Sequence, residues 1–204
     1  MTGSPVLDRL LLVALLVAAA VSSHQLLRGR SVDRYVTGRS AETGHLVMNL
    51  VMALMLTAWW TGIVRVGALA VLGALALSFA VLLVRGPAAA RPAHLFHLVA
   101  AAAMLYAEFA GHPAGTDMVG MDMSGHAGPG AVAWLLAVLF ALDAVATSLI
   151  VLLAPHLALA PTPVPVPAGP RTAPPRADVR TLRIGTVPHV VMDVGMVAML
   201  LATG

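Results

Sequence analysis

The sequence predicts an all-α, polytopic membrane helix bundle with about six transmembrane helices and both chain termini outside. Of its 204 residues, 59% are hydrophobic and only 10% are charged, whereas a soluble domain carries about a quarter charged residues. The apolar residues form long blocks, and a helix needs about 20 mostly apolar residues to cross the hydrocarbon. Because lipid offers the backbone no hydrogen-bond partner, each block is expected to be helical.

Six apolar blocks are the expected membrane helices. They cover about 6–27, 44–61, 64–84, 92–110, 130–153 and 186–203. The first is expected to be a retained helix. A cleaved signal peptide is the alternative, but it needs a positive start, and here Asp8 and Arg9 cancel. A tight link around Gly62 joins the second and third blocks, and the sixth opens around Pro188, since proline is tolerated in a first helical turn.

The blocks divide the chain into three parts. Residues 1–154 form a five-helix transmembrane part with an outer loop at 111–129, and residues 186–204 form the sixth transmembrane helix. Between them, residues 155–185 form a cytoplasmic linker whose first part is dense in proline, which favours an extended, polyproline-II-like chain.

The arginines predict the orientation. The expected loops after the first, third and fifth helices hold Arg28, Arg30, Arg34, Arg39, Arg85, Arg91, Arg171, Arg176, Arg180 and Arg183. Only Arg9 and Arg65 fall on the other side. Basic residues are enriched in cytoplasmic loops, so the Arg-rich side is predicted to be inside. Trp59, Trp60 and Trp134 then all fall at the outer interface, where aromatic belts form.

Composition also excludes several functions. The net charge of +3 comes from arginines in the gaps between blocks, so we predict a lipid bilayer as the partner and no nucleic acid. The absence of cysteine excludes disulfides, thiolate metal sites and cysteine nucleophiles. Short loops, and the lack of zinc-protease, hydrolase and phosphate-loop motifs, argue against an enzyme.

The methionines are concentrated in the second, fourth and sixth blocks and in the loop at 111–129. The second and sixth blocks share the pattern H-x2-M-x3-M-x2-M, which starts at His45 and at His189, and the fourth carries a degenerate version with His97 and Met104. These offsets fall within about 80° of one helix face. All three helices are expected to enter from the inside, so their histidines start at a similar depth.

This pattern predicts a copper site, because a thioether is a soft, neutral donor that prefers Cu(I) and imidazole also suits copper. The expected ligands are His45, Met48, Met52, Met55, His97, Met104, His189, Met192, Met196 and Met199. The outer loop would capture metal through His112, Met118, Met121, Met123 and His126, a spacing that resembles Met/His-rich loops of copper-handling proteins. Glu108, Asp143 and Asp193 would compensate charge, although Asp143 equally suits a hydrogen bond to Thr147 or Ser148.

Three alternatives stay open. Methionine rows also pack helices against each other without binding metal. The three histidines could ligate a b-type haem, though two axial ligands would leave most methionines unexplained. The chain could also be a non-catalytic accessory subunit whose Met-rich faces pack on a membrane-protein partner.

The His-Leu-Val-Met opening at 45–48, the Arg-rich first loop and the Pro-rich linker resemble a family of uncharacterised multi-pass membrane proteins from actinobacteria, a domain of unknown function. The resemblance covers most of the chain and implies a location in the plasma membrane. It supplies no activity, so the copper hypothesis rests on the residues alone.

Overall fold

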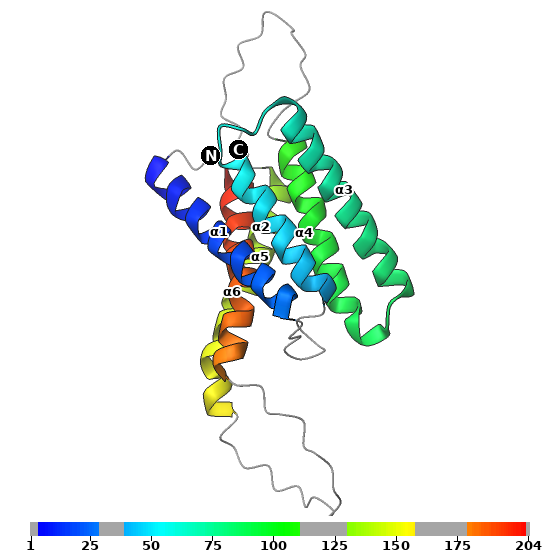
Figure 1. The fold of residues 1–204 in the computed structure, drawn as a ribbon, viewed down its shortest axis with the longest axis vertical. Coiled ribbons are helices and arrows are strands. Elements are labelled where there is room, and N and C mark those ends of the chain that lie inside the picture. Colours follow the sequence, from blue (N-terminus) through cyan, green and yellow to red (C-terminus); the bar gives the residue numbers. More distant parts are fainter. Residues whose placement is uncertain (1–3, 29–38, 111–129, 158–178, 203–204) are drawn as a thin grey trace, which may run out of the picture.

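The computed structural model is a bundle of long α-helices (Figure 1). It describes residues 4–28, 39–110, 130–157 and 179–202, and in these ranges it contains no strand. The all-α prediction is therefore confirmed for the described ranges. Their helices are α1 (Pro5–Arg28), α2 (Arg39–Met55), α3 (Gly62–Arg85), the short 3-10 helix η1 (Ala88–Ala90), α4 (Arg91–Ala110), α5 (Ala131–Leu157) and α6 (Val179–Leu201).

Five of these helices are long and apolar enough to cross a membrane, namely α1, α3, α4 with η1, α5 and α6. The membrane character of the chain is thus supported. Helix α2 is not among the five, because its 17 residues extend over only about 25 Å, whereas the hydrocarbon core is roughly 30 Å thick.

Helix α2 also differs from its expected range of 44–61. It begins at Arg39, five residues before the predicted start. Hydropathy did not locate this first turn because its residues are polar. It ends at Met55, where the amides of Leu56 and Thr57 bond to carbonyls three residues back and tighten the last turn. The link to α3 covers residues 56–61, so it is longer than predicted, and Gly62 begins α3 with a φ of 50°, in the left-handed region that favours glycine.

Helix α6 begins at Val179, earlier than expected, and Pro188 lies inside it rather than at its start. Membrane helices tolerate an internal proline where neighbouring groups satisfy the freed backbone atoms. Since α5 continues to Leu157, helices enter the predicted linker from both sides, and residues 158–178 lie outside the described part of the chain. The predicted outer loop at 111–129 lies outside it too.

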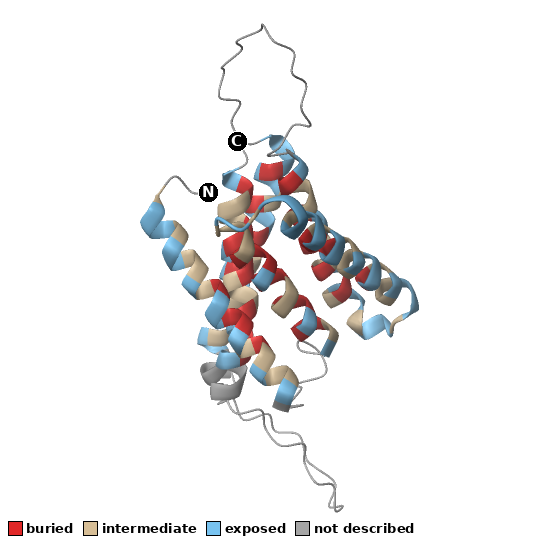
Figure 2. Ribbon diagram, turned by 45° about the horizontal axis from the view of Figure 1, so that its top comes forward, coloured by how far each residue is buried: buried red, intermediate tan, exposed pale blue. Residues whose placement is uncertain are grey.

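Helix α2 occupies the middle of the bundle, where it contacts α1, α3, α4 and α6, while α5 packs along α6 (Figure 1). Buried residues line the inward faces, and exposed residues run along the outer faces of α1 and α3 (Figure 2). The first turn of α1, the last turn of α6 and the α2–α3 turn lie at one end of the bundle. The predicted topology likewise has both termini and the link between the second and third helices on one side. Which side of a membrane this end faces stays a prediction.

Candidate metal centre

Three histidines from three helices meet in the core. The ring centroid of His45 on α2 lies 4.8 Å from that of His97 on α4 and 5.2 Å from that of His189 on α6. His45 and His97 are almost fully buried. Helices α2, α4 and α6 therefore face one another at the level of the histidines.

His189 connects two neighbours through its two ring nitrogens. Its Nε2 lies 2.6 Å from Oδ2 of Asp143 on α5, and its Nδ1 lies 3.1 Å from Nε2 of His45. An ionised Asp143 can only accept, so Nε2 of His189 carries the proton that it donates. In the neutral ring Nδ1 is then the acceptor, and His45 donates to it from its Nε2. This chain of hydrogen bonds leaves Nδ1 of His45 as a lone-pair nitrogen, and that atom is buried without a hydrogen-bond partner among the described residues.

Asp193 lies one turn after His189 on α6. Its side chain is 0% exposed, and its Oδ2 lies 3.6 Å from Nε2 of His189. Within the described ranges, neither carboxylate oxygen of Asp193 makes a hydrogen bond. One ligand atom from each of Asp143, His189 and Asp193 falls within 4.8 Å of the other two, which is close enough for all three to hold one ion.

His97 is held in a fixed orientation by α4 and α3. Its Nδ1 lies 2.7 Å from the carbonyl oxygen of Ala93 and donates to it, and its ring stacks on Phe79 with centroids 4.9 Å apart. Nε2 is therefore the lone-pair nitrogen. It is buried and makes no hydrogen bond with the described residues, although the Ala41 carbonyl of α2 faces the ring.

Five of the predicted methionine ligands are buried in the same core. Met48, Met52, Met104, Met192 and Met196 are each between 0% and 3% exposed. Met55 and Met199 are partly buried and pack against this core cluster. Burial inside the bundle is shared by ligands and by packing residues, so it does not by itself separate the two interpretations.

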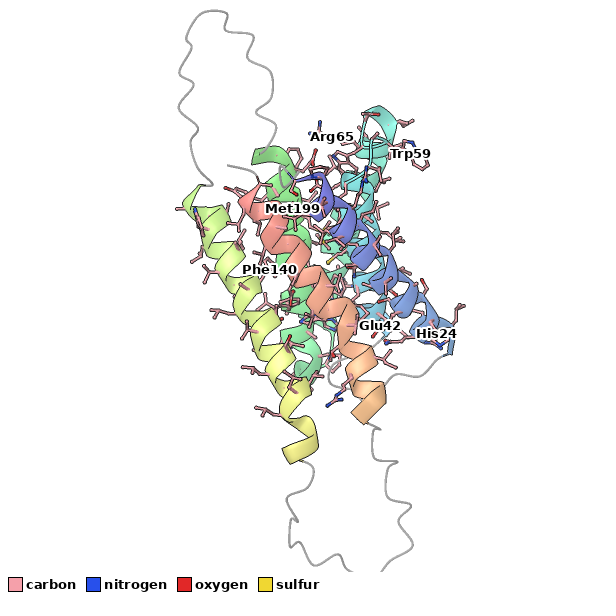
Figure 3. All side chains as sticks on the ribbon, turned by 90° about the vertical axis from the view of Figure 1, so that its left-hand side faces the viewer. His24, Glu42, Trp59, Arg65, Phe140 and Met199 are labelled. Carbon is pink, nitrogen blue, oxygen red and sulfur yellow. The ribbon has the colours of Figure 1, made fainter. Side chains whose placement is uncertain are left out.

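Glu108 does not join the histidines. It forms an ion pair with Arg65 of α3, and it follows His97 by eleven residues on α4, which corresponds to about 16 Å along the helix. Figure 3 places Arg65 and Trp59 toward one end of the bundle and Glu42 toward the other. The predicted capture residues His112, Met118, Met121, Met123 and His126 lie outside the described residues.

Sequence reasoning missed several residues that shape this centre. Phe79 and Phe96 pack on the histidine rings, but an aromatic residue in an apolar block gives no sign of what it contacts. Gly44 allows α2 to approach α3 and α4, since a Cβ there would lie 2.7 Å from Cδ2 of His97 and 2.9 Å from Cζ of Phe79.

Asn49 is a further residue that shapes the centre. It donates to the carbonyls of His45 at 2.7 Å and of Pro188 at 3.3 Å, and so joins α2 to α6. Its polar side chain inside a methionine row was the one available signal.

A smaller polar cluster lies between α1 and α2. The Gln25 amide faces the carboxylate of Glu42, and with its nitrogen assigned to that side it donates to both carboxylate oxygens, at 2.7 and 3.1 Å. Glu42 is 4% exposed and precedes His45 by three residues, about one helical turn. The cluster fixes α1 against the start of the central helix.

Comparison with known proteins identifies a family and no function. No curated protein and no solved structure matches the chain. A family model described as "Domain of unknown function (DUF5134)" matches residues 37–203, a range that includes the three histidines, both aspartates and all the buried methionines. The chain belongs to this family.

Proposed function

We propose that this protein binds copper as Cu(I) in the membrane core, between α2, α4 and α6. One observation carries the proposal: five buried methionines and three histidines converge on the helices whose sequences share the His/Met spacing. A structure in which these rows faced lipid would have left them no common space.

The donor atoms suit a soft monovalent ion. Nδ1 of His45 and Nε2 of His97 have lone pairs without hydrogen-bond partners among the described residues. Thioether sulfurs of Met48, Met52, Met104, Met192 and Met196 occupy the adjoining turns. Soft thioether ligands select Cu(I), and imidazole binds it as well. Because a thioether is neutral, the methionine sites hold a monovalent ion without a carboxylate among their ligands.

The proposed setting is the plasma membrane with both termini outside. The ten arginines on one side support this orientation, and the resemblance to actinobacterial multi-pass proteins supports the location. In that setting the loop at 111–129 would collect copper from the outer side and pass it to the intramembrane rows.

The haem alternative is less well supported by the geometry. Two imidazole nitrogens on opposite sides of one metal lie about 4 Å apart, given a metal–nitrogen bond of about 2 Å. Here Nε2 of His45 and Nδ1 of His189 are 3.1 Å apart and hydrogen-bonded, and Phe96 packs on the His189 ring. In this arrangement these two nitrogens bond to each other and are not the axial pair of one haem.

The test is metal content and an absorption spectrum of the detergent-purified protein after loading with Cu(I) under reducing conditions. We expect stoichiometric copper and no Soret band. The double variant Met52→Leu/Met196→Leu keeps the packing volume to within a small change and is expected to lose most of the copper. Leu72→Met, which adds a thioether at a buried position on α3, serves as the matched control and should leave the copper content unchanged.

The other outcomes are equally informative. A Soret band in the purified protein would show that the cofactor is haem and would contradict the copper proposal. Copper that is absent from the wild type, or unchanged in the double variant, would mean that the methionines only pack the helices. The accessory-subunit interpretation would then be the better one.

A further inference from the structure

We infer a second metal site, at the α5–α6 interface, in which Asp143, His189 and Asp193 bind one divalent cation of the class that prefers nitrogen and oxygen ligands. This site differs in ligand chemistry from the Cu(I) rows, by which we mean the His/Met residues of α2, α4 and α6 proposed to bind copper. None of its three side chains carries sulfur. It stands whether or not the methionines bind copper.

The geometry brings three ligand atoms to one point. Nε2 of His189 lies 2.6 Å from Oδ2 of Asp143 and 3.6 Å from Oδ2 of Asp193, and one ligand atom of each residue falls within 4.8 Å of the others. Bonds of about 2 Å from a metal to nitrogen or oxygen keep ligand atoms roughly 3 Å apart. The present separations bracket that value, so small side-chain rotations are enough to admit an ion.

Asp193 supplies an independent observation. Its side chain is completely buried and, within the described part of the chain, its carboxylate oxygens make no hydrogen bond. Buried polar groups are nearly always satisfied, and an unsatisfied carboxylate inside a membrane protein is costly. A cation coordinated by these oxygens removes that cost.

Charge selects a divalent ion over a monovalent one. Asp143 and Asp193 contribute two negative charges when both are ionised, and neutral His189 contributes none. A divalent cation leaves the site neutral, whereas a monovalent cation leaves one negative charge in a medium of low dielectric constant. A set of two carboxylates and one imidazole suits zinc, manganese and ferrous iron, and the hard carboxylate oxygens match Cu(I) poorly.

The surroundings of His189 are those of a metal ligand. When Nε2 of His189 binds the ion, the proton of this neutral ring lies on Nδ1, which donates to Nε2 of His45 at 3.1 Å. Nε2 of His189 then presents its lone pair to the ion beside the two carboxylates, and His45 carries its own proton on Nδ1. Metal-binding histidines nearly always have their second ring nitrogen fixed in this way. Asp143 and His189 retain exposed side-chain fractions of 35% and 19%, which gives the buried Asp193 a way to be reached.

The experiment uses Co²⁺ as the probe, added to the full-length protein in detergent. We expect one equivalent to bind and to give ligand-field absorption bands. Asp193→Asn and Asp143→Asn are isosteric, and each should weaken Co²⁺ binding by about tenfold or more, since even a lost outer-shell partner has an effect of that size. Asp8→Asn removes a carboxylate from the first turn of α1 and should leave binding unchanged.

Two further measurements keep the site distinguishable from the Cu(I) rows. Met52→Leu/Met196→Leu should bind Co²⁺ as the wild type does, whatever it does to copper. X-ray absorption of the Co²⁺-loaded wild type should detect only oxygen and nitrogen neighbours, which tests the ligand set even where an aspartate variant does not fold. Sulfur neighbours, wild-type protein that does not bind Co²⁺, or unchanged binding in both aspartate variants would each overturn the inference.

Discussion

Nε2 of His45 and Nδ1 of His189 lie 3.1 Å apart although 144 positions separate the two residues in the chain. The contact joins the central helix α2 to the last helix α6. Because Asp143 bonds to the other nitrogen of His189, α5 is included in the same network. The candidate centre therefore depends on the assembled bundle and cannot form on any one helix.

The two histidines of α4 should behave differently. His97 faces His45, whereas His94 lies one turn earlier and contacts Phe79, with ring centroids 6.1 Å apart. We expect His97→Phe to lower the Cu(I) affinity by about tenfold or more, which corresponds to about 1.4 kcal/mol. His94→Phe should leave it unchanged, as measured by competition with a Cu(I) chelator. Equal effects of the two variants on Cu(I) affinity would contradict the assignment of His97 as a copper ligand.

Gly44 should resist even a methyl group. An added Cβ would meet His97 and Phe79 at 2.7 and 2.9 Å, so we expect Gly44→Ala to destabilise the protein by about 1 to 3 kcal/mol through overpacking. Thermal unfolding in detergent measures the effect. At Gly67 on α3 a Cβ would have no described neighbour within 4 Å, and Gly67→Ala should be neutral or slightly stabilising because alanine is the better helix former. Similar losses for both would contradict the close approach at Gly44.

The ion pair between Arg65 and Glu108 should couple α3 to α4. The Glu108 side chain is 6% exposed and the Arg65 side chain is 31% exposed, so the burial of this ion pair is intermediate between that of surface pairs and that of buried pairs. Surface pairs stabilise a protein by less than about 1 kcal/mol. A double-mutant cycle with Arg65→Gln and Glu108→Gln is expected to give a coupling energy of about 1 to 2 kcal/mol. A cycle of Arg65→Gln with Ser78→Ala, an exposed position farther along α3, should be additive. Additivity in the first cycle would mean that the pair does not hold the helices together.

Asn49 should matter for the contact between α2 and α6. Leucine has the same branching at Cγ as asparagine but is larger and cannot donate, so the replacement removes the bonds to the His45 and Pro188 carbonyls and adds some overpacking. The expected loss of stability is about 1 to 3 kcal/mol. Thr43→Val is the matched control, because the exposed Thr43 hydroxyl bonds only to the Arg39 carbonyl within its own helix. Denaturation in mixed micelles compares the two, and a larger loss for the threonine variant would argue against the cross-link.

The sequence predicted a His/Met face on three helices and left open whether these helices meet. The offsets of histidine and methionine gave one face on each of the second, fourth and sixth blocks, and the shared entry side placed the histidines at one depth. The structure brings His45, His97 and His189 together as those offsets require. Helical period and entry side follow from spacing and give the faces and their depth, whereas which helices pack together depends on contacts between helices that spacing does not encode.

The partners of the acids could not be predicted in the same way. Asp143 bonds to His189 across the α5–α6 interface, although a bond within α5 to Thr147 or Ser148 was an equal expectation. Apart from a few polar residues, α5 is apolar on every face, so its sequence did not reveal how the helix is rotated about its axis. The extent of α2 was missed for a related reason, since hydropathy locates apolar residues while hydrogen bonds decide where a helix ends.

The short central helix has a consequence for how this protein is built. With 17 residues that include Glu42, His45 and Asn49, α2 has neither the length nor the apolarity to remain in a bilayer alone. Its polar groups become acceptable in the membrane only where α1, α3, α4 and α6 replace lipid around it. Because α6 follows α2 in the chain, α2 is synthesised before one of the helices that surround it, and its polar groups are fully enclosed only after α6 has packed against it.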